Sequence, residues 1–186
     1  SCAASPAFAA TPTNQAVTQG YGTDSNIQLG MIVKLEDKNA SKVEALTGDT
    51  INKMFGVAVA ANDATVTISN NGNSGQVFVA TFGRYDTLVS NENGPIKPSD
   101  YITISSLGGV GMKADAVQSI VLGRAAAGFD GTSNVQGTTT LKTTSGKQLT
   151  VSLARIPVDI SVAHNPLQQS IDNNLPGFLQ KASQFI

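Results

Sequence analysis

The sequence predicts a mostly β protein. Short runs rich in Val, Ile, Thr and Phe alternate with clusters of Gly, Asn and Asp, and hydrophobic residues recur mainly at a period of two. Ser, Thr and Asn make up about a quarter of the 186 residues and Gly contributes 18, a composition typical of turn-rich β structure. We therefore expect an all-β fold, a β-barrel or β-sandwich, with a short helical segment at its C-terminal end.

The charge of the chain argues against a nucleic-acid partner. Only 13% of the residues are charged and the formal net charge is -1. A phosphate-binding surface needs clustered Lys and Arg, and no such cluster is present in the sequence. The sequence also has no run of about eighteen apolar residues that could span a membrane.

The N-terminal residues predict export. Ala7-Phe8-Ala9 before Ala10 has the small-x-small pattern of a signal-peptidase site, so we interpret residues 1–9 as a signal-peptide remnant. An ordinary Ala-rich terminus is the alternative. The export interpretation predicts an extracellular or cell-surface location. The polar residues 10–25 that follow are expected to form a linker or an edge segment.

A single β domain is expected over residues 26–163. The strands expected in its first half are 28–35, 42–46, 55–60, 65–69 and 76–82, and those in its second half are 101–105, 109–114, 120–126, 141–144 and 149–156. The Asn- and Gly-rich residues 70–75 suit a hairpin turn. One helical turn is expected at 49–54 and another at 115–118, and the polar residues 128–146 are expected to form a long exposed hairpin.

The two halves of this domain, 26–90 and 94–160, resemble each other. The segments that correspond are Met31-Ile32-Val33 and Tyr101-Ile102-Thr103, Lys42-Val43-Glu44-Ala45 and Met112-Lys113-Ala114, and Phe55-Gly56-Val57-Ala58 and Leu122-Gly123-Arg124-Ala125. A weak internal duplication, giving a pseudo-two-fold barrel or sandwich, accounts for the likeness. Chance similarity among short β segments accounts for it as well.

The C-terminal residues 164–186 form an amphipathic pattern. Apolar residues recur there at roughly helical spacing, interrupted by Pro176-Gly177. A helix that packs on the domain and an interfacial segment that leads to a membrane anchor beyond Ile186 both fit this pattern.

The sequence offers no constellation of catalytic or metal-binding residues. Cys2 is the single cysteine, so neither an internal disulfide nor a cysteine-based metal site is expected. His164 is the only histidine and is expected in a surface loop. A Ser-His-Asp set can be written with His164 and Asp159, but there is no Gly-x-Ser-x-Gly motif to single out a nucleophile. We therefore expect no enzyme activity and no catalytic, cofactor-binding or metal-binding residues.

Three other polar motifs have simpler interpretations. Glu36-Asp37 is most simply a solvated turn. The glycines at 108–111 lack the Lys-Ser/Thr that completes a phosphate-binding loop. The oxygen-rich segment 130–134 lacks the spacing and the terminal Glu of a calcium loop. No cofactor is expected.

One stretch, residues 93–130, carries a more specific pattern. Its parts are Gly94-Pro95-Ile96-Lys97-Pro98-Ser99-Asp100, the strand Tyr101-Ile102-Thr103-Ile104-Ser105, then Gly109-Val110-Gly111-Met112-Lys113-Ala114 and Ile120-Val121-Leu122-Gly123-Arg124-Ala125. This stretch resembles a β module of phage tail fibres and peptidase G2-like C-terminal regions. Ser99 stands where that family usually has Gly, and Arg124 where it often has Lys. The resemblance implies self-cleavage or trimer assembly at most, and no catalytic residue of the family can be matched.

These observations favour a non-catalytic surface or assembly module that is exported. Its layout is similar to the ectodomains of membrane-anchored bacterial surface proteins, and a fibre or filament component is equally consistent with it. The partners expected are other protein subunits, including further copies of the chain, or cell-surface components. A ligand- or glycan-binding module that uses residues 128–146 is the alternative. A self-processing or hydrolytic β domain is the third reading.

Overall fold

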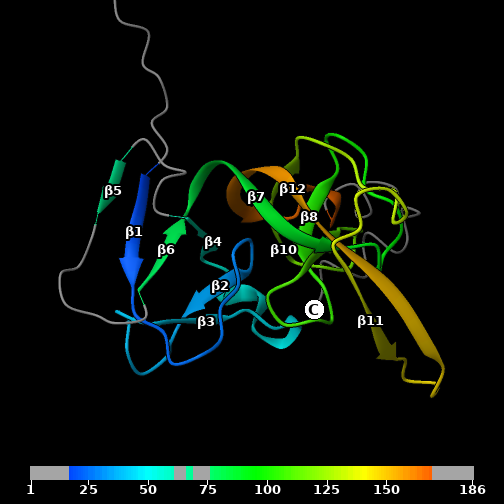
Figure 1. Ribbon diagram of the computed structural model, residues 1–186, viewed down its shortest axis with the longest axis horizontal. Coiled ribbons are helices and arrows are strands. Elements are labelled where there is room, and N and C mark those ends of the chain that lie inside the picture. The colour runs from blue at the N-terminus through cyan, green and yellow to red at the C-terminus, as the bar shows by residue number, and fades with distance from the viewer. Residues whose placement is uncertain (1–16, 61–65, 69–75, 169–186) are drawn as a thin grey trace, which may run out of the picture.

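The structure, a computed structural model, describes residues 17–60, 66–68 and 76–168. Within these residues twelve β-strands and one 3-10 helix are present, together with a helical turn at residues 166–168 (Figure 1). They are β1 (Val17–Tyr21), β2 (Ile32–Leu35), β3 (Val43–Ala45), η1 (Gly48–Lys53), β4 (Gly56–Val59), β5 (Val66–Ile68), β6 (Val77–Ala80), β7 (Phe82–Ser90), β8 (Tyr101–Ile104), β9 (Gly111–Lys113), β10 (Ile120–Ala125), β11 (Gly137–Lys142) and β12 (Gln148–His164). The predicted all-β class is confirmed.

The strands form two sheets that follow one another along the chain. The first has the order β3-β2-β4-β6-β1-β5, and the second has the order β10-β8-β9-β7-β12-β11. An additional pairing of β10 with β12 closes five strands of the second sheet into a barrel. In the first sheet a parallel bridge between Gly22 and Lys42 joins the end of β1 to the start of β3. The ends of a five-strand set meet in both sheets, and the architecture is of the barrel type.

The boundary between the two halves lies at Thr81. The first sheet ends with β6 at Ala80 and the second begins with β7 at Phe82. The halves expected from the sequence are 26–90 and 94–160, with no strand expected over 83–90. β7 is in fact a central strand of the second sheet, paired with β12 over nine residues.

The two halves repeat the same strand order in register. β2 lies between β3 and β4, and β8 lies between β9 and β10 in the same way. Three backbone hydrogen bonds of the first half recur in the second. Gly30 N to Ala58 O (2.7 Å) corresponds to Ser99 N to Ala125 O (2.8 Å), and Ala58 N to Met31 O (2.9 Å) corresponds to Ala125 N to Asp100 O (2.8 Å). Leu46 N to Ile32 O (3.0 Å) corresponds to Ala114 N to Tyr101 O (2.8 Å). These bonds make Ile32 equivalent to Tyr101, one residue away from the correspondence drawn in the sequence. The internal duplication is thus visible in the hydrogen bonding as well as in the strand order.

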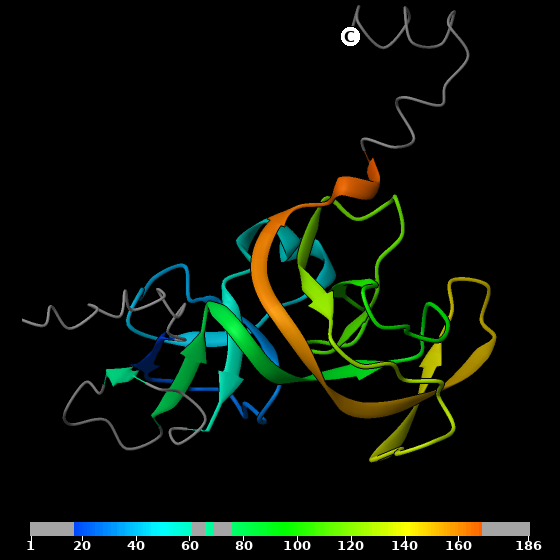
Figure 2. The same ribbon diagram turned by 90° about the horizontal axis from the view of Figure 1, so that it is seen from above.

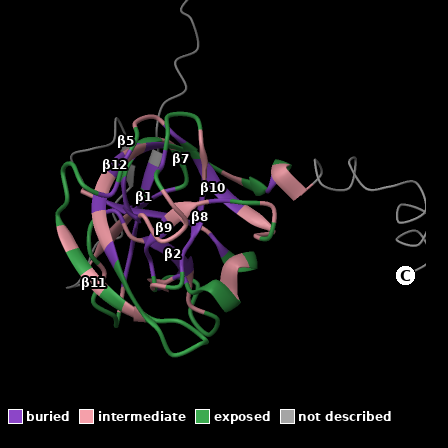
Figure 3. Ribbon diagram, turned by 90° about the vertical axis from the view of Figure 1, so that its right-hand side faces the viewer, coloured by how far each residue is buried: buried purple, intermediate pink, exposed green. Residues whose placement is uncertain are grey.

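The core follows from the alternation of apolar residues along these strands (Figure 3). The interior of the first half holds Tyr21, Val33, Val43, Ala58 and Val79. A larger cluster runs through the second barrel and into the junction between the halves, and it includes Ile32, Leu46, Val57, Ala80, Val89, Ile102, Leu122, Val158 and Ile160. The two halves consequently share one apolar cluster.

Two glycines allow the halves to approach closely. Gly30 has φ 88° and accepts a hydrogen bond from Leu88 N at 2.8 Å. Gly109 has φ 75°, accepts from Ile32 N at 2.8 Å and donates to Leu46 O at 2.8 Å. Both conformations lie in the left-handed region, where glycine is favoured.

Several local expectations differ from the structure. Val17–Tyr21, expected within a linker or edge segment, form β1, which pairs with β6 on one side and β5 on the other. β5 and β6 do not form a hairpin, because β1 lies between them. Residues 115–118 form a bend and not a helical turn.

The last three described residues form a helical turn. Pro166–Gln168 are helical, and the Asn165 side chain caps them by accepting from Leu167 N at 3.0 Å. His164, expected in a loop, is the last residue of β12. The predictions for residues 1–9, for the turn at 70–75 and for 169–186 of the amphipathic segment lie outside the described residues.

Candidate functional site

A β-hairpin extends away from the second barrel. We call residues 137–153, which contain β11, the turn and the first part of β12, the β11–β12 hairpin (Figures 1 and 2). β12 pairs with β11 from Gln148 to Leu153, and its pairing with β7 begins only at Leu153. Most of the hairpin therefore has no third strand beside it in the described structure.

β11 is the edge strand of its sheet. The bond from Thr143 N to Lys147 O, at 2.8 Å, shows that residues 137, 139 and 141 turn their backbone groups toward β12. Thr138, Thr140 and Lys142 consequently direct their N–H and C=O groups to the open side. This edge is a template to which another strand can be added.

The side chains of the hairpin are unusually exposed for a paired strand. Thr138, Thr140 and Lys142 are exposed, and the alternate residues of β11 are only half-buried. Leu141 lies opposite Leu149, and 42% of Leu149 is exposed. The hairpin thus offers an apolar pair next to an open edge, a combination typical of an interaction surface.

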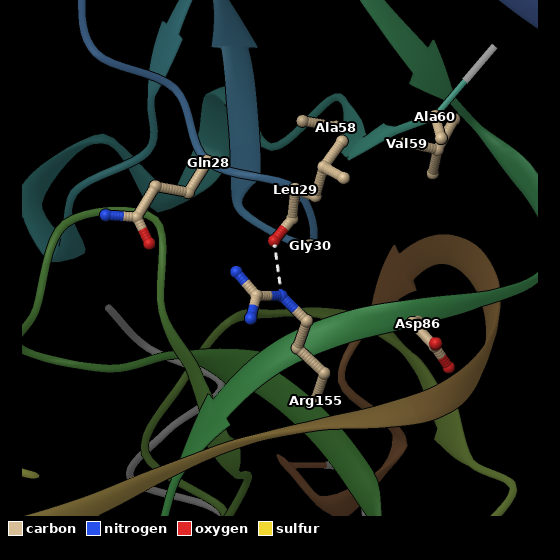
Figure 4. Close-up of a pocket in the computed structure, with 8 residues that line it drawn as sticks. All are labelled: Gln28, Leu29, Gly30, Ala58, Val59, Ala60, Asp86 and Arg155. Atoms are coloured by element: carbon tan, nitrogen blue, oxygen red, sulfur yellow. Dashed lines mark hydrogen bonds between the residues drawn. The ribbon is translucent and has the colours of Figure 1, made fainter. Parts of the chain in front are cut away.

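The base of the hairpin is tied to the first half of the molecule by Arg155. Its Nε donates to Leu29 O at 2.8 Å, and its Nη1 donates to Gln136 Oε1 at 2.7 Å. Figure 4 shows the guanidinium reaching from β12 toward Leu29 across a cleft of about 520 Å³. The cleft is lined by Gln28, Leu29, Gly30, Ala58, Val59, Ala60, Asp86 and Arg155. Because Arg155 already bonds to both sides, we interpret it as a structural tie.

A second hollow lies on the outer face of the second barrel. This Gly123 hollow has a volume of about 350 Å³ and is lined by Tyr101, Val121, Gly123, Arg124, Asp159, Ser161, Ala163, His164 and Pro166. Cross-strand pairing places four side chains in one row over β7, β12, β10 and β8: Arg84, Asp159, Arg124 and Tyr101. No sequence motif predicts this row, because its members come from four separate strands.

Arg124 is held in place within this row. Its guanidinium carbon lies 5.1 Å from the centre of the Tyr101 ring, and its Nε donates to Ser99 O at 3.0 Å. Ser99 has φ 76°, a conformation that glycine adopts more readily. Its equivalent in the first half is Gly30, which has φ 88°.

Asp159 lies between Arg124 and Arg84 in the row and is paired with Arg84. Its two carboxylate oxygens accept from Arg84 Nε at 2.7 Å and Nη2 at 3.1 Å. Hydrogen bonding to Arg84 lowers the pKa of the Asp159 carboxyl. The structure places Asp159 and His164, which the sequence allows to be written as part of a Ser-His-Asp set, in the lining of the same hollow, and there the Asp159 carboxylate is bonded to Arg84.

The remaining motifs take structural roles. Asp130 Oδ1 accepts from Thr132 N at 2.8 Å and Ser133 N at 2.7 Å, and these bonds lower the pKa of Asp130 to about 2. Its carboxylate therefore organises the loop before β11. Asp37 binds Lys53 at 2.6 Å and Lys34 at 3.4 Å.

The described residues contain neither a metal-binding cluster of side chains nor a helix that could cross a membrane. No three His, Cys, Asp or Glu side chains gather there in a way that could hold a metal ion. No described helix has the length and apolar composition needed to cross a membrane. Comparison with known proteins adds no relative: no model of a protein family matches the chain, and no curated protein matches it.

Proposed function

We propose that the chain is a non-catalytic module of an exported surface assembly, in which the β11–β12 hairpin joins neighbouring subunits. The observation that carries the proposal is the open edge of β11 on a hairpin that extends beyond a closed barrel. A closed barrel removes strand edges, so a long exposed edge is a feature that soluble proteins usually cover. The signal-like N-terminus supports the exported part of the proposal.

A second copy of the chain is the partner that fits this edge. In an antiparallel pair of two β11 strands centred on Thr140, each Lys142 faces Thr138 of the other copy, so like charges do not meet. Thr140 faces its own counterpart, and Thr–Thr pairs are favourable across strands. The Leu141 and Leu149 side chains of both copies would then lie on one continuous face and cover each other.

The interface expected from such a short edge is small, so the association should be weak. We expect a Kd above about 1 µM, which is typical of contacts that bury less than about 1,200 Å². Many weak contacts suit an assembly in which subunits are also concentrated at a surface.

Sedimentation velocity over a wide range of protein concentration tests the proposal. We expect concentration-dependent self-association of the full chain, and its loss in Thr140→Pro. Proline removes the N–H that faces the open side and is tolerated in edge strands, so the hairpin itself should remain. Thr140→Val is the matched control, because it keeps the N–H and β propensity; it should associate like the parent.

Two results would overturn this proposal. One is a chain that stays monomeric up to about 1 mM. The other is association that Thr140→Pro leaves intact. Fractionation of cells that express the full-length gene tests the exported part separately, since a cytoplasmic product contradicts it whatever the oligomeric state.

A further inference from the structure

The two halves use the same face of the repeated fold differently: it is buried in the first half and lines an open hollow in the second. The residues of the Gly123 hollow have equivalents in the first half through the shared hydrogen bonds and cross-strand pairs. Tyr101 corresponds to Ile32, Gly123 to Gly56, Arg124 to Val57 and Asp159 to Ala80. Of these first-half residues, Ile32, Val57 and Ala80 belong to the apolar cluster that joins the two barrels, and all three are 0% exposed.

The same face of the second barrel is open and has become polar. An isoleucine, a valine and an alanine are replaced by Tyr101, Arg124 and Asp159. If another apolar surface covered this face, its charged side chains would lose their contact with water, at a high cost in free energy. The face is therefore suited to contact with water or with a polar ligand. It is not suited to packing against a further barrel in the way that the first barrel packs against the second.

The arrangement of Arg124 is that of a preorganised anion-binding group. Its Nε donates to Ser99 O and its guanidinium carbon lies 5.1 Å from the centre of the Tyr101 ring, while no hydrogen bond of its two Nη groups is found within the described residues. A guanidinium fixed in this way matches a carboxylate, which accepts two parallel N–H donors. Little conformational entropy is then lost when the anion binds.

The rest of the hollow suits a ring with hydroxyl groups. Gly123 forms a floor without a side chain, and Val121 and Ala163 supply small apolar surface beside it. On the rim, the Asp159 carboxylate can accept hydrogen bonds and the Ser161 hydroxyl can donate or accept them. Arg84 keeps Asp159 ionised and oriented.

We propose that the Gly123 hollow binds a pyranose that bears a carboxylate, such as a uronic acid residue of an acidic glycan. The carboxylate would bind the Nη groups of Arg124, and ring hydroxyls would bind Asp159 and Ser161. The CH face of the ring would lie on Gly123. A volume of about 350 Å³ is at the small end of the usual range for ligand sites and fits a single sugar ring.

Amide chemical-shift mapping by NMR on the full chain tests the site, with glucuronate as the probe. We expect saturable shifts at Gly123, Arg124 and Ser161 with a Kd of about 1 mM, the affinity typical of a ligand of this size. Glucose, which lacks the carboxylate, and acetate, which lacks the ring, should each bind at least about tenfold more weakly.

Variants then assign the contacts. Arg124→Gln should weaken the binding of glucuronate at least about tenfold. The affinity of Arg124→Lys should lie between those of the parent and Arg124→Gln, because lysine keeps the charge and loses the paired donors. Lys147→Gln is the matched control, because it removes one positive charge in the turn of the β11–β12 hairpin, outside the lining of the hollow. This variant should bind glucuronate like the parent.

Four results would overturn this proposal: no shifts with glucuronate at about ten times the expected Kd, equal shifts with glucose, equal binding by acetate, or glucuronate binding that Arg124→Gln leaves unchanged. Thr140→Pro should bind glucuronate normally, so this proposal and that of assembly through the hairpin can fail independently.

Discussion

Gly56 of β4 and Gly123 of β10 occupy the same position in the two barrels. A Cβ atom at Gly56 would overlap the carbonyl oxygen of Ala80 on the neighbouring strand. A Cβ atom at Gly123 would overlap the carbonyl oxygen of Asp159, the residue equivalent to Ala80. The glycine that recurs in both halves of the sequence is therefore explained by close contact between two strands of each barrel.

Substituting either glycine should destabilise the fold. In Gly56→Ala or Gly123→Ala the methyl group meets backbone, which cannot move aside as a flexible side chain can. We expect each variant to lose about 1–3 kcal/mol of unfolding free energy, the usual cost of overpacking, measured by urea denaturation. Gly137→Ala is the control, because a Cβ there meets no other atom within 4 Å. Wild-type stability in both barrel variants would contradict the steric argument.

Sequence patterns predicted most short strands because each half-buried run alternates plainly. They failed at β7, because Gly83 and Thr87 flank Tyr85 on the more buried face and supply little apolar signal between the exposed Arg84 and Asp86. They also ended the last strand at Ile156, because Pro157 usually excludes a central strand. Pro157 is tolerated because its nitrogen faces the side of β12 that is opposite β7, at a gap in the strand pairing. On that side the pairing with β11 ends at Leu153 and the pairing with β10 begins at Val158.

The candidate sites were harder to predict than the fold. The hairpin was expected from the polar residues 128–146, since local composition is enough to indicate an exposed loop. The row of Arg84, Asp159, Arg124 and Tyr101 depends on the register of four strands. A one-residue error in register reverses the face on which a side chain lies, so such a row cannot be read from spacing along the chain.

Removing the tie at Arg155 should loosen the base of the hairpin. In Arg155→Lys a single ammonium replaces a guanidinium that bonds to Leu29 O and Gln136 Oε1 at once. We expect a loss of about 1 kcal/mol in unfolding free energy. Hydrogen exchange of the hairpin amides should also become faster. In a double-mutant cycle with Gln136→Ala, the two effects should not be additive, and strict additivity would contradict the contact.

Acid should weaken the loop before β11 through Asp130. Backbone N–H donors from Ser133 and Thr132 lower the folded-state pKa of Asp130 to about 2, below the ordinary value of 3.8. A lowered folded-state pKa gives a contribution to stability that is present above about pH 4 and is lost as the pH falls toward 2. Asp130→Asn keeps an acceptor but does not titrate. Thermal unfolding should therefore show a difference in Tm between the parent and Asp130→Asn that is smaller at about pH 2.5 than at about pH 5. Asp86→Asn, an exposed carboxylate on β7, controls for the loss of one charge.

Lys34 of β2 and Glu44 of β3 form a pair in which only one partner is buried. Lys34 Nζ lies 2.6 Å from Glu44 Oε1, with 6% of the lysine side chain and 38% of the glutamate side chain exposed. The hydrogen bond to Glu44 is the main cause of a raised Lys34 pKa. Removing the exposed partner leaves an ammonium buried with only Asp37, at 3.4 Å, to compensate it. Replacing Lys34 by methionine instead removes the charge and keeps the length of the side chain. We therefore expect Glu44→Gln to lose about 1 kcal/mol more unfolding free energy than Lys34→Met in urea denaturation at neutral pH. The opposite ranking would show that the pair itself stabilises the sheet and that burial of the lysine costs little.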